Sequence, residues 1–236
     1  MSHTQGIRQV RKQKTRQALL DAALLLLEEQ SLSGLGLREV TRAAGVAPTA
    51  FYRHFRDPAD LGVALVEQAL DSLHGTIGAI LTATDGDEER IDRTVRAMAE
   101  YVRAYPAHVR FIARERHGGV RSVREAIAAQ LRRFSEEVAS ALAAEPVSAG
   151  WSRDDLRMLA DVYVDQMVMT ASAFLDAAER RPGTERHPGT ERHPETQHAP
   201  EGEHPPEEAA EAEARVVTAA RRRLRLIALG RRHWLD

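Results

Sequence analysis

The 236-residue chain contains no cysteine. It can therefore form neither a disulfide framework nor a thiolate metal site, and it has no cysteine nucleophile. Aromatic residues are also scarce, at 5% of the sequence, and the runs of β-branched and aromatic residues that favour strands are missing. Alanine, leucine, arginine and glutamate are abundant instead. These features predict an all-α fold.

Long apolar segments are missing as well. No stretch approaches the roughly 18 apolar residues of a membrane span, and the N-terminal segment MSHTQGIRQVRKQK lacks the apolar centre of a secretory signal. We therefore expect a cytoplasmic protein with no membrane partner. A Gly-rich phosphate loop, a His-Glu-x-x-His motif and a Gly-x-Ser-x-Gly motif are all missing from the sequence. The sequence thus predicts neither an enzyme nor a cofactor.

Charge is distributed unevenly along the chain. The formal net charge is −2 at pH 7, yet the first 56 residues hold nine Lys or Arg against four Asp or Glu. Such a local surplus of cations is typical of a region that binds nucleic acid. The N-terminal quarter of the chain is therefore the candidate DNA-binding region.

The segment LREVTRAAGVAPTAFYRHF, residues 37–55, has the pattern of a helix-turn-helix. Apolar residues recur at helical spacing up to Gly45, which stands where the end of a helix favours a residue tolerant of positive φ. After this turn, Pro48 suits the first turn of a second helix, because its missing N–H costs nothing there. We expect this second helix, from Ala47 to His54, to be the recognition helix.

Apolar residues at three- and four-residue spacing predict further helices on both sides of this motif. We expect a mobile arm over residues 1–10 and then a helix to about residue 30. Later helices are expected at about residues 57–83, 88–104, 120–143, 152–180 and 209–234, with a short segment before His117. Asp57 and Ser152 have the side chains of helix N-caps.

Composition changes sharply at residues 181–208, RPGTERHPGTERHPETQHAPEGEHPPEE. This stretch contains a tandem PGTERH repeat and almost no apolar side chains, so nothing in it offsets the entropy of ordering. We expect a disordered acidic loop. Its four histidines follow the repeat and not a ligand spacing, so we predict no metal site.

The last predicted helix is rich in arginine. Its arginines are Arg221, Arg222, Arg223, Arg225, Arg231 and Arg232. They could form a second DNA-binding segment, or a basic face that is solvated or paired with acidic residues. The sequence alone leaves both interpretations open.

The segment LREVTRAAGVAPTAFYRHFRDPADL, residues 37–61, resembles the TetR family of bacterial transcriptional repressors. FYRHFRDPADLG, RFIARERHGG at 110–119 and LRLIALGRRHW at 224–234 further resemble the FabR/DesT branch, which represses unsaturated fatty-acid synthesis genes. The resemblance implies a TetR-like fold with a DNA-binding domain over residues 1–56 and a helical effector-binding and dimerisation domain over residues 57–236. It also implies a homodimer on a palindromic, double-stranded DNA operator.

The resemblance assigns DNA contacts within the first domain. These residues are Lys12, Lys14, Arg38, Thr49, Ala50, Tyr52, Arg53, His54 and Arg56. Thr49 and Ala50 would approach base edges, whereas Tyr52 and His54 would contact phosphates. Each assignment has a competing interpretation. His54 could be a buried structural residue, Tyr52 could serve packing alone, and the N-terminal cations could be a solvated run of charge. Pro58 replaces a phosphate-binding lysine of many family members, and Arg56 could substitute for it.

The resemblance also implies a hydrophobic effector, in this branch a long-chain acyl-CoA or acyl-carrier-protein thioester. The candidate effector-binding residues are Met98, Tyr101, Val102, Phe111, Arg114, Phe134, Met167 and Phe174. Any of the apolar residues could instead belong to the hydrophobic core. Arg114 and Arg116 could bind the phosphates of an acyl carrier or pair with acidic residues.

The dimer interface is expected on the last two long helices. Its candidate residues are Leu159, Val162, Tyr163, Gln166, Thr170, Val217, Ala220, Leu224 and Ile227. Two other functions stay open. One is a TetR-type repressor that senses an unrelated hydrophobic compound or drug, and the other is an architectural DNA-binding protein without an effector.

Overall fold

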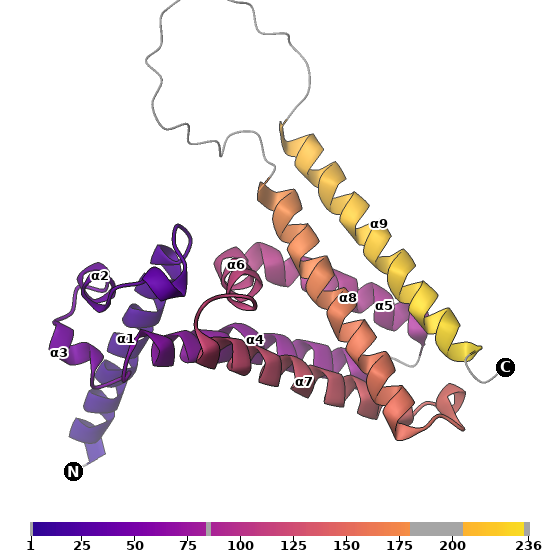
Figure 1. Ribbon diagram of the computed structural model, residues 1–236, viewed down its shortest axis with the longest axis horizontal. Helices are drawn as coiled ribbons and strands as arrows, with labels where there is room; N and C mark the ends of the chain where they lie inside the picture. Colours follow the sequence, from indigo (N-terminus) through magenta and orange to yellow (C-terminus); the bar gives the residue numbers. More distant parts are fainter. Residues whose placement is uncertain (1, 84–85, 180–204, 234–236) are drawn as a thin grey trace, which may run out of the picture.

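The computed structural model describes residues 2–83, 86–179 and 205–233 (Figure 1). The described residues form α-helices, short 3₁₀-helices and turns, and none of them forms a strand. The prediction of an all-α fold is confirmed.

The N-terminal head, residues 2–57, consists of α1 (Ser2–Leu26), the 3₁₀-helix η1 (Leu32–Gly34), α2 (Leu37–Ala43) and α3 (Pro48–Phe51). The prediction of a mobile arm over residues 1–10 is wrong for residues 2–10, which form the first turns of α1. The stretch contains no proline, and its continuation in α1 carries Lys12, Lys14, Arg11 and Arg16, which have high helix propensity. The helix that the apolar residues anchor further along therefore extends back through residues 2–10. In Figure 1 this end of α1 projects away from the rest of the molecule.

A small apolar core holds the head together. Leu19 and Ala23 on α1 are buried with Val40 on α2 and with Phe51 and Phe55 around α3. The guanidinium of Arg16 lies 5.2 Å from the centre of the Phe55 ring. The two phenylalanines therefore fix α3 against α1, as their apolar character among polar neighbours predicts.

Helix α4 (Pro58–Ala83) leaves the head and passes along the remaining helices (Figure 1). The Asp57 Oδ1 atom accepts a hydrogen bond from the backbone N–H of Asp60 at 2.8 Å, which confirms the predicted N-cap. The domain boundary predicted at residue 56 coincides with the start of α4, and the division into two domains stays a prediction.

The remaining elements are α5 (Asp87–Ala104), α6 (Pro106–Glu115), α7 (Arg121–Ala143), η2 (Pro146–Ser148), α8 (Arg153–Glu179) and α9 (Pro205–Arg232). Helix α7 packs against α4 and α8, and α9 packs against α8 and α5. The Ser152 hydroxyl accepts a hydrogen bond from the Asp155 N–H at 3.1 Å, as expected of an N-cap. None of the helices in the described ranges is both long and apolar enough to cross a membrane.

The predicted disordered loop, residues 181–208, falls mostly outside the described residues. Residues 205–208 are described and belong to α9, so the prediction is wrong for them. Pro205 and Pro206 are compatible with this start, because the first turn of a helix does not use its backbone N–H groups.

Candidate DNA-binding surface and ligand cavity

Gly45 makes the turn between α2 and α3. Its φ is 66°, and its N–H donates to the carbonyl oxygen of Arg42 at 3.1 Å, while the Val46 N–H donates to that of Thr41 at 3.0 Å. These bonds satisfy carbonyl groups that the end of α2 would otherwise leave open. A side chain at this position would strain the backbone, so the glycine that the sequence places here is the residue that the turn requires.

The recognition element is shorter than predicted. Helix α3 spans only Pro48–Phe51, and the chain then tightens into turns between Tyr52 and His54. The Arg53 N–H donates to the carbonyl oxygen of Ala50, and the His54 N–H to that of Phe51, at 3.3 and 2.9 Å. These are bonds over three residues, as in a 3₁₀-helix. The prediction of one helix from Ala47 to His54 is therefore corrected to one α-helical turn followed by a tighter one.

This element presents polar side chains to solvent. Thr49 and Arg53 are exposed, and Tyr52 is 64% exposed, so packing does not account for the tyrosine. Ala50 is half-buried beside them, and Phe51 is fully buried on the opposite side. The remaining predicted DNA-binding cations, Lys12, Lys14, Arg38 and Arg56, are also exposed.

His54 is half-buried next to the basic side of α1. Burial lowers the pKa of its imidazole, and the nearby cations Lys12, Arg16 and Arg53 lower it further. The Nδ1 atom is buried and has no hydrogen-bond partner among the described residues. The lowered pKa favours the neutral imidazole in the free protein, and an anion bound at His54 would be stabilised by the three cations.

Arg56 pairs with Asp60 of α4. Its guanidinium donates to Asp60 Oδ1 at 2.9 Å and its backbone N–H to Asp60 Oδ2 at 3.0 Å. These bonds lower the pKa of Asp60. The Arg56 side chain remains exposed, so the pair is weak and the guanidinium is accessible to a phosphate.

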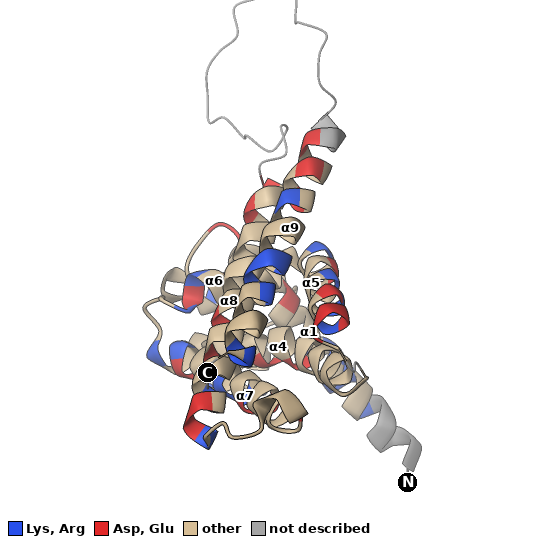
Figure 2. Cartoon of the chain, turned by 90° about the vertical axis from the view of Figure 1, so that its right-hand side faces the viewer, with Lys and Arg blue, Asp and Glu red and all other residues tan. Residues whose placement is uncertain are grey.

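The arginines of α9 have a different environment. Basic residues lie along α9, and the neighbouring α5 carries both acidic and basic residues (Figure 2). The ion pairs are Arg221–Asp92 at 2.7 Å, Arg225–Glu88 at 2.6 Å, Arg231–Asp87 at 2.9 Å and Arg232–Asp87 at 3.0 Å. Of the two interpretations that the sequence left open, the structure favours a basic face paired with acids for these four residues.

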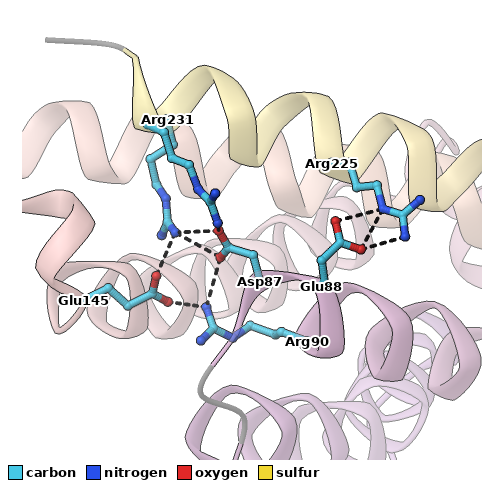
Figure 3. A network of polar contacts seen from close by, with 7 residues as sticks. Asp87, Glu88, Arg90, Glu145, Arg225 and Arg231 are labelled. Carbon is cyan, nitrogen blue, oxygen red and sulfur yellow. Dashed lines mark hydrogen bonds and ion pairs between the residues drawn. The ribbon is translucent and has the colours of Figure 1, made fainter. Parts of the chain in front are cut away.

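Arg231 is the centre of a buried ion cluster, which we name the α5 cluster: Asp87, Arg90, Glu145 and Arg231 (Figure 3). Only 1% of the Arg231 side chain is exposed, and its Nη2 atom donates to Asp87 Oδ1 at 2.9 Å and to Glu145 Oε2 at 2.7 Å. Arg90 also pairs with Asp87 and Glu145. The two positive and two negative charges balance one another.

A cavity of about 160 Å³ lies between α4, α5, α6, α7 and α8, with one residue from α9. Most of its walls are apolar. They are formed by Leu70, Leu73, Ile77, Leu81, Ile91, Met98, Val109, Ile112, Ala113, Leu131, Phe134, Val138, Leu142, Val164, Met167, Val168, Ala171 and Leu224. The polar lining residues are Asp87, Arg90, Thr94, Tyr101, His108, Arg116, Tyr163 and Ser172. The arrangement suits a mainly hydrophobic ligand.

Half of the predicted effector-binding residues line this cavity, namely Met98, Tyr101, Phe134 and Met167. The other four do not. Val102, Phe111 and Phe174 are buried in the core, and Arg114 binds backbone carbonyl groups elsewhere. For all eight residues, a role in effector binding stays a prediction.

Two tyrosines in the cavity are neutral over the physiological pH range. Burial raises the pKa of Tyr101 and that of Tyr163 to about 12 each. The Tyr101 hydroxyl donates to the carbonyl oxygen of Ala69. Tyr163 was expected at a dimer interface but lines the cavity, and its spacing of four residues from Met167 and eight from Ala171 was the signal that could have placed it there.

Helix α6 contacts both the cavity and the head. Its residues Val109, Ile112 and Ala113 line the cavity. Arg114 donates to the carbonyl oxygens of Leu27 and Gln30 at 2.8 and 2.9 Å, just beyond the end of α1.

Glu115 makes a second, buried connection between α6 and the head. Its side chain accepts a hydrogen bond from the Leu32 N–H at 2.9 Å, and the residue is only 1% exposed. A side chain on Gly118 would approach the Glu115 carboxylate to 2.2 Å, so the glycine makes room for this group. The two connections join the cavity wall directly to the head.

The predicted dimer residues are only partly at the surface. Thr170, Ala220 and Leu224 are buried within the single chain, and the predicted dimer interface stays a prediction. Leu159, Gln166, Val217 and Ile227 are half-buried, and Val162 is exposed. The exposed apolar residues that sequence reasoning missed on these two helices are Met158, Met169, Leu226 and Leu229.

A helix-turn-helix head followed by helices that enclose an apolar cavity defines the class of helix-turn-helix transcriptional regulators. Residues 19–65 match the family described as bacterial regulatory proteins, tetR family. An uncharacterised HTH-type transcriptional regulator of Haemophilus influenzae is 38% identical over 135 residues, which cover 57% of this chain and 66% of that protein. The family match thus lies in the helix-turn-helix head, and the chain spans just under two thirds of the length of the curated regulator that it resembles.

Solved structures of the family share the fold. NalD of Pseudomonas aeruginosa, the secondary repressor of the MexAB-OprM multidrug efflux pump, is 21% identical with a TM-score of 0.56, and the match covers 71% of this chain and 88% of NalD. FadR of Bacillus subtilis, in complex with stearoyl-CoA, is 15% identical with a TM-score of 0.52, over 68% of this chain and 95% of FadR. At these identities the comparison establishes the fold alone.

Proposed function

We propose that the protein is a dimeric repressor that binds a palindromic operator in the bacterial cytoplasm and responds to an acyl chain carried as a CoA or acyl-carrier-protein thioester. The observation that carries the effector class is the lining of the cavity. Its lining residues on α5 extend from Asp87 to Tyr101, a distance of about 21 Å along the helix. An apolar lining of this extent favours a hydrocarbon chain over a compact polar molecule.

The head supplies the DNA contacts of this proposal. Thr49 and Ala50 approach base edges in the major groove, Tyr52 and His54 contact phosphates, and Arg53 reaches a phosphate or a guanine edge. Arg38, Arg56, Lys12 and Lys14 add phosphate contacts from the surrounding surface. Support comes from the exposure of Thr49, Tyr52, Arg53 and the four surrounding cations, and from the location of all these groups in the head.

The dimer forms through α8 and α9. On α8 the exposed residues Met158, Val162 and Met169 recur at spacings of four and seven, so they share one face. Leu226 and Leu229 are exposed on the neighbouring α9. Exposed apolar side chains at helical spacing favour burial against a partner, and a twofold dimer would present two heads to a palindrome.

Effector binding reaches the head through α6 and α4. Both helices line the cavity, and α4 continues from the head. Helix α6 binds the residues after α1 through Arg114 and the start of η1 through Glu115. A ligand that binds two arrangements of these helices unequally changes the spacing of the two heads. The ligand releases DNA if it favours the arrangement that does not fit the operator, and it retains DNA if it favours the arrangement that does.

The resemblance of residues 110–119 and 224–234 to the FabR/DesT branch supports fatty-acid genes as the regulated genes. The stearoyl-CoA complex of FadR supports the same effector class, whereas the drug-pump repressor NalD supports the alternative, an unrelated hydrophobic compound.

Thermal unfolding with palmitoyl-CoA, oleoyl-CoA and a panel of hydrophobic drugs distinguishes an acyl-thioester effector from an unrelated hydrophobic compound. We expect the acyl-CoA esters to raise the melting temperature in a concentration-dependent manner. A response to drugs with none to either ester would contradict the lipid assignment.

A further inference from the structure

We propose that the effector carries an anionic head group and that Arg116 binds this group at the mouth of the cavity. The inference rests on the acyl-effector function proposed above and adds the chemistry and position of the head group. It follows from a comparison of the charged residues around the cavity.

The mouth of the cavity lies beside the C-terminal end of α6. Ala113 lines the cavity and is exposed, so the cavity reaches the surface there. Arg116 follows one turn later, lines the cavity too, and keeps 33% of its side chain exposed. Its Nη2 atom pairs with Asp165 Oδ1 of α8 at 3.1 Å, so this ion pair connects α6 and α8 at the opening.

The pair between Arg116 and Asp165 is easy to exchange. Asp165 is 66% exposed, and an ion pair this open to solvent contributes at most about 1 kcal/mol. A ligand carboxylate or phosphate at the mouth could replace Asp165 as the partner of the guanidinium. The planar guanidinium suits either anion, because it donates two parallel hydrogen bonds to a pair of oxygens.

The other arginines near the cavity already bind partners within the protein. Arg114 binds the carbonyl groups after α1, and Arg110 pairs with Glu28 and Glu179. Within the α5 cluster, Arg90 and Arg231 face the carboxylates of Asp87 and Glu145. An anionic head group there would meet two carboxylates in a buried site, which is unfavourable. Arg116 is therefore the cation that can receive the head group, and the hydrocarbon tail lies along the apolar walls.

The test uses three probes with the same hydrocarbon chain: hexadecanoic acid, hexadecan-1-ol and hexadecanoyl-CoA. Their affinities are measured by isothermal titration below the concentrations at which they form micelles. For the wild type we expect the acid, the CoA ester or both to bind at least about tenfold more tightly than the alcohol, which is the scale of a hydrogen bond to a charged group. Tight binding of the acid alone identifies a carboxylate, and tight binding of the ester alone identifies a phosphate-bearing head.

Three variants make the assignment specific. Arg116→Gln should lose the preference for the anionic probe and leave the affinity for the alcohol unchanged, and Arg116→Lys should restore part of it. Asp165→Asn removes the competing anion and should bind the anionic probe more tightly than the wild type. Unfolding curves without ligand confirm that each variant folds.

Two results would overturn the role of Arg116 while leaving an apolar effector in place. One is equal affinity of the wild type for all three probes. The other is that Arg116→Gln loses the same amount of affinity for the acid, the ester and the alcohol. Failure of every probe to bind would overturn the acyl-effector proposal itself, and this inference with it. The two failures are thus distinguishable.

Discussion

The cations of the head and the cations of α9 are chemically alike but differ in what surrounds them. Lys12, Arg38 and Arg53 are exposed, and no acidic partner for them occurs in the described part of the chain. Arg225 and Arg231 of α9 instead pair with acids of α5. Exposed cations without partners remain available to phosphates, whereas paired cations hold one helix against another. The partners of an arginine, more than its presence, therefore indicate whether it is available to an anion or holds two helices together.

The largest effect is expected in the head. Tyr52→Ala and His54→Ala should each weaken operator binding by about 10- to 100-fold per head, and two heads in a dimer make the loss complete at physiological salt. Fluorescence anisotropy with an operator fragment measures the affinity, and light scattering checks that the dimer persists. Normal binding by both variants would refute the assigned surface.

On α9, Arg231→Met should lower the free energy of unfolding by about 3 kcal/mol, because the partly buried carboxylates of Asp87 and Glu145 lose the buried guanidinium that pairs with both. Chemical denaturation measures this change. The folded fraction should bind the operator with wild-type affinity, since the proposed DNA contacts lie in the head and not on α9. A loss of operator affinity without a loss of stability would show that Arg231 contributes to DNA binding and not to stability, contrary to this expectation.

Arg114 tests whether a paired cation can transmit a signal. Arg114→Ala removes the hydrogen bonds from α6 to the carbonyl groups after α1, at a cost of about 1 kcal/mol in stability. We expect acyl-CoA affinity to be retained and its effect on operator binding to be reduced. Arg121→Gln, whose guanidinium pairs only along its own helix with Glu125, is the matched control. An unchanged effector response in Arg114→Ala would exclude this connection.

His54 gives the head a dependence on pH. Burial and three cations lower its pKa in the free protein, so protonation below its usual range opposes folding and stability falls as the pH decreases through that window. A bound phosphate favours the protonated form, so operator affinity should rise by about threefold from pH 8 to pH 6. His54→Gln should abolish this rise. A rise of the same size in the variant would assign the pH dependence to another group.

Local signals account for what the sequence predicts well. The glycine turn at Gly45 and the caps at Asp57 and Ser152 are features of single residues and their neighbours, and each is found in the structure. Helical periodicity places the α-helices, because it reports which side of a helix is buried. At α3 the periodic pattern continues beyond the helix, since buried Phe51 and Phe55 keep the same spacing across a tighter turn.

Periodicity does not distinguish the lining of a cavity from solid core. Tyr101 lines the cavity while its neighbour Val102 is packed behind it, and Ile112 lines it while Phe111 does not. That distinction depends on how several helices cross. The same limit applies to the dimer face, where Leu224 is enclosed by the chain's own helices and Leu226 is exposed.

The salt dependence of operator affinity tests the central comparison most directly. It is measured for the wild type, Arg53→Gln and Arg225→Gln on the same operator fragment, which is first located by footprinting the region upstream of the protein's own gene. Removing a cation that binds a phosphate reduces the slope of log affinity against log salt by about one for each head. We predict a smaller slope for Arg53→Gln and a wild-type slope for Arg225→Gln. A wild-type slope for Arg53→Gln together with a reduced one for Arg225→Gln would contradict the account.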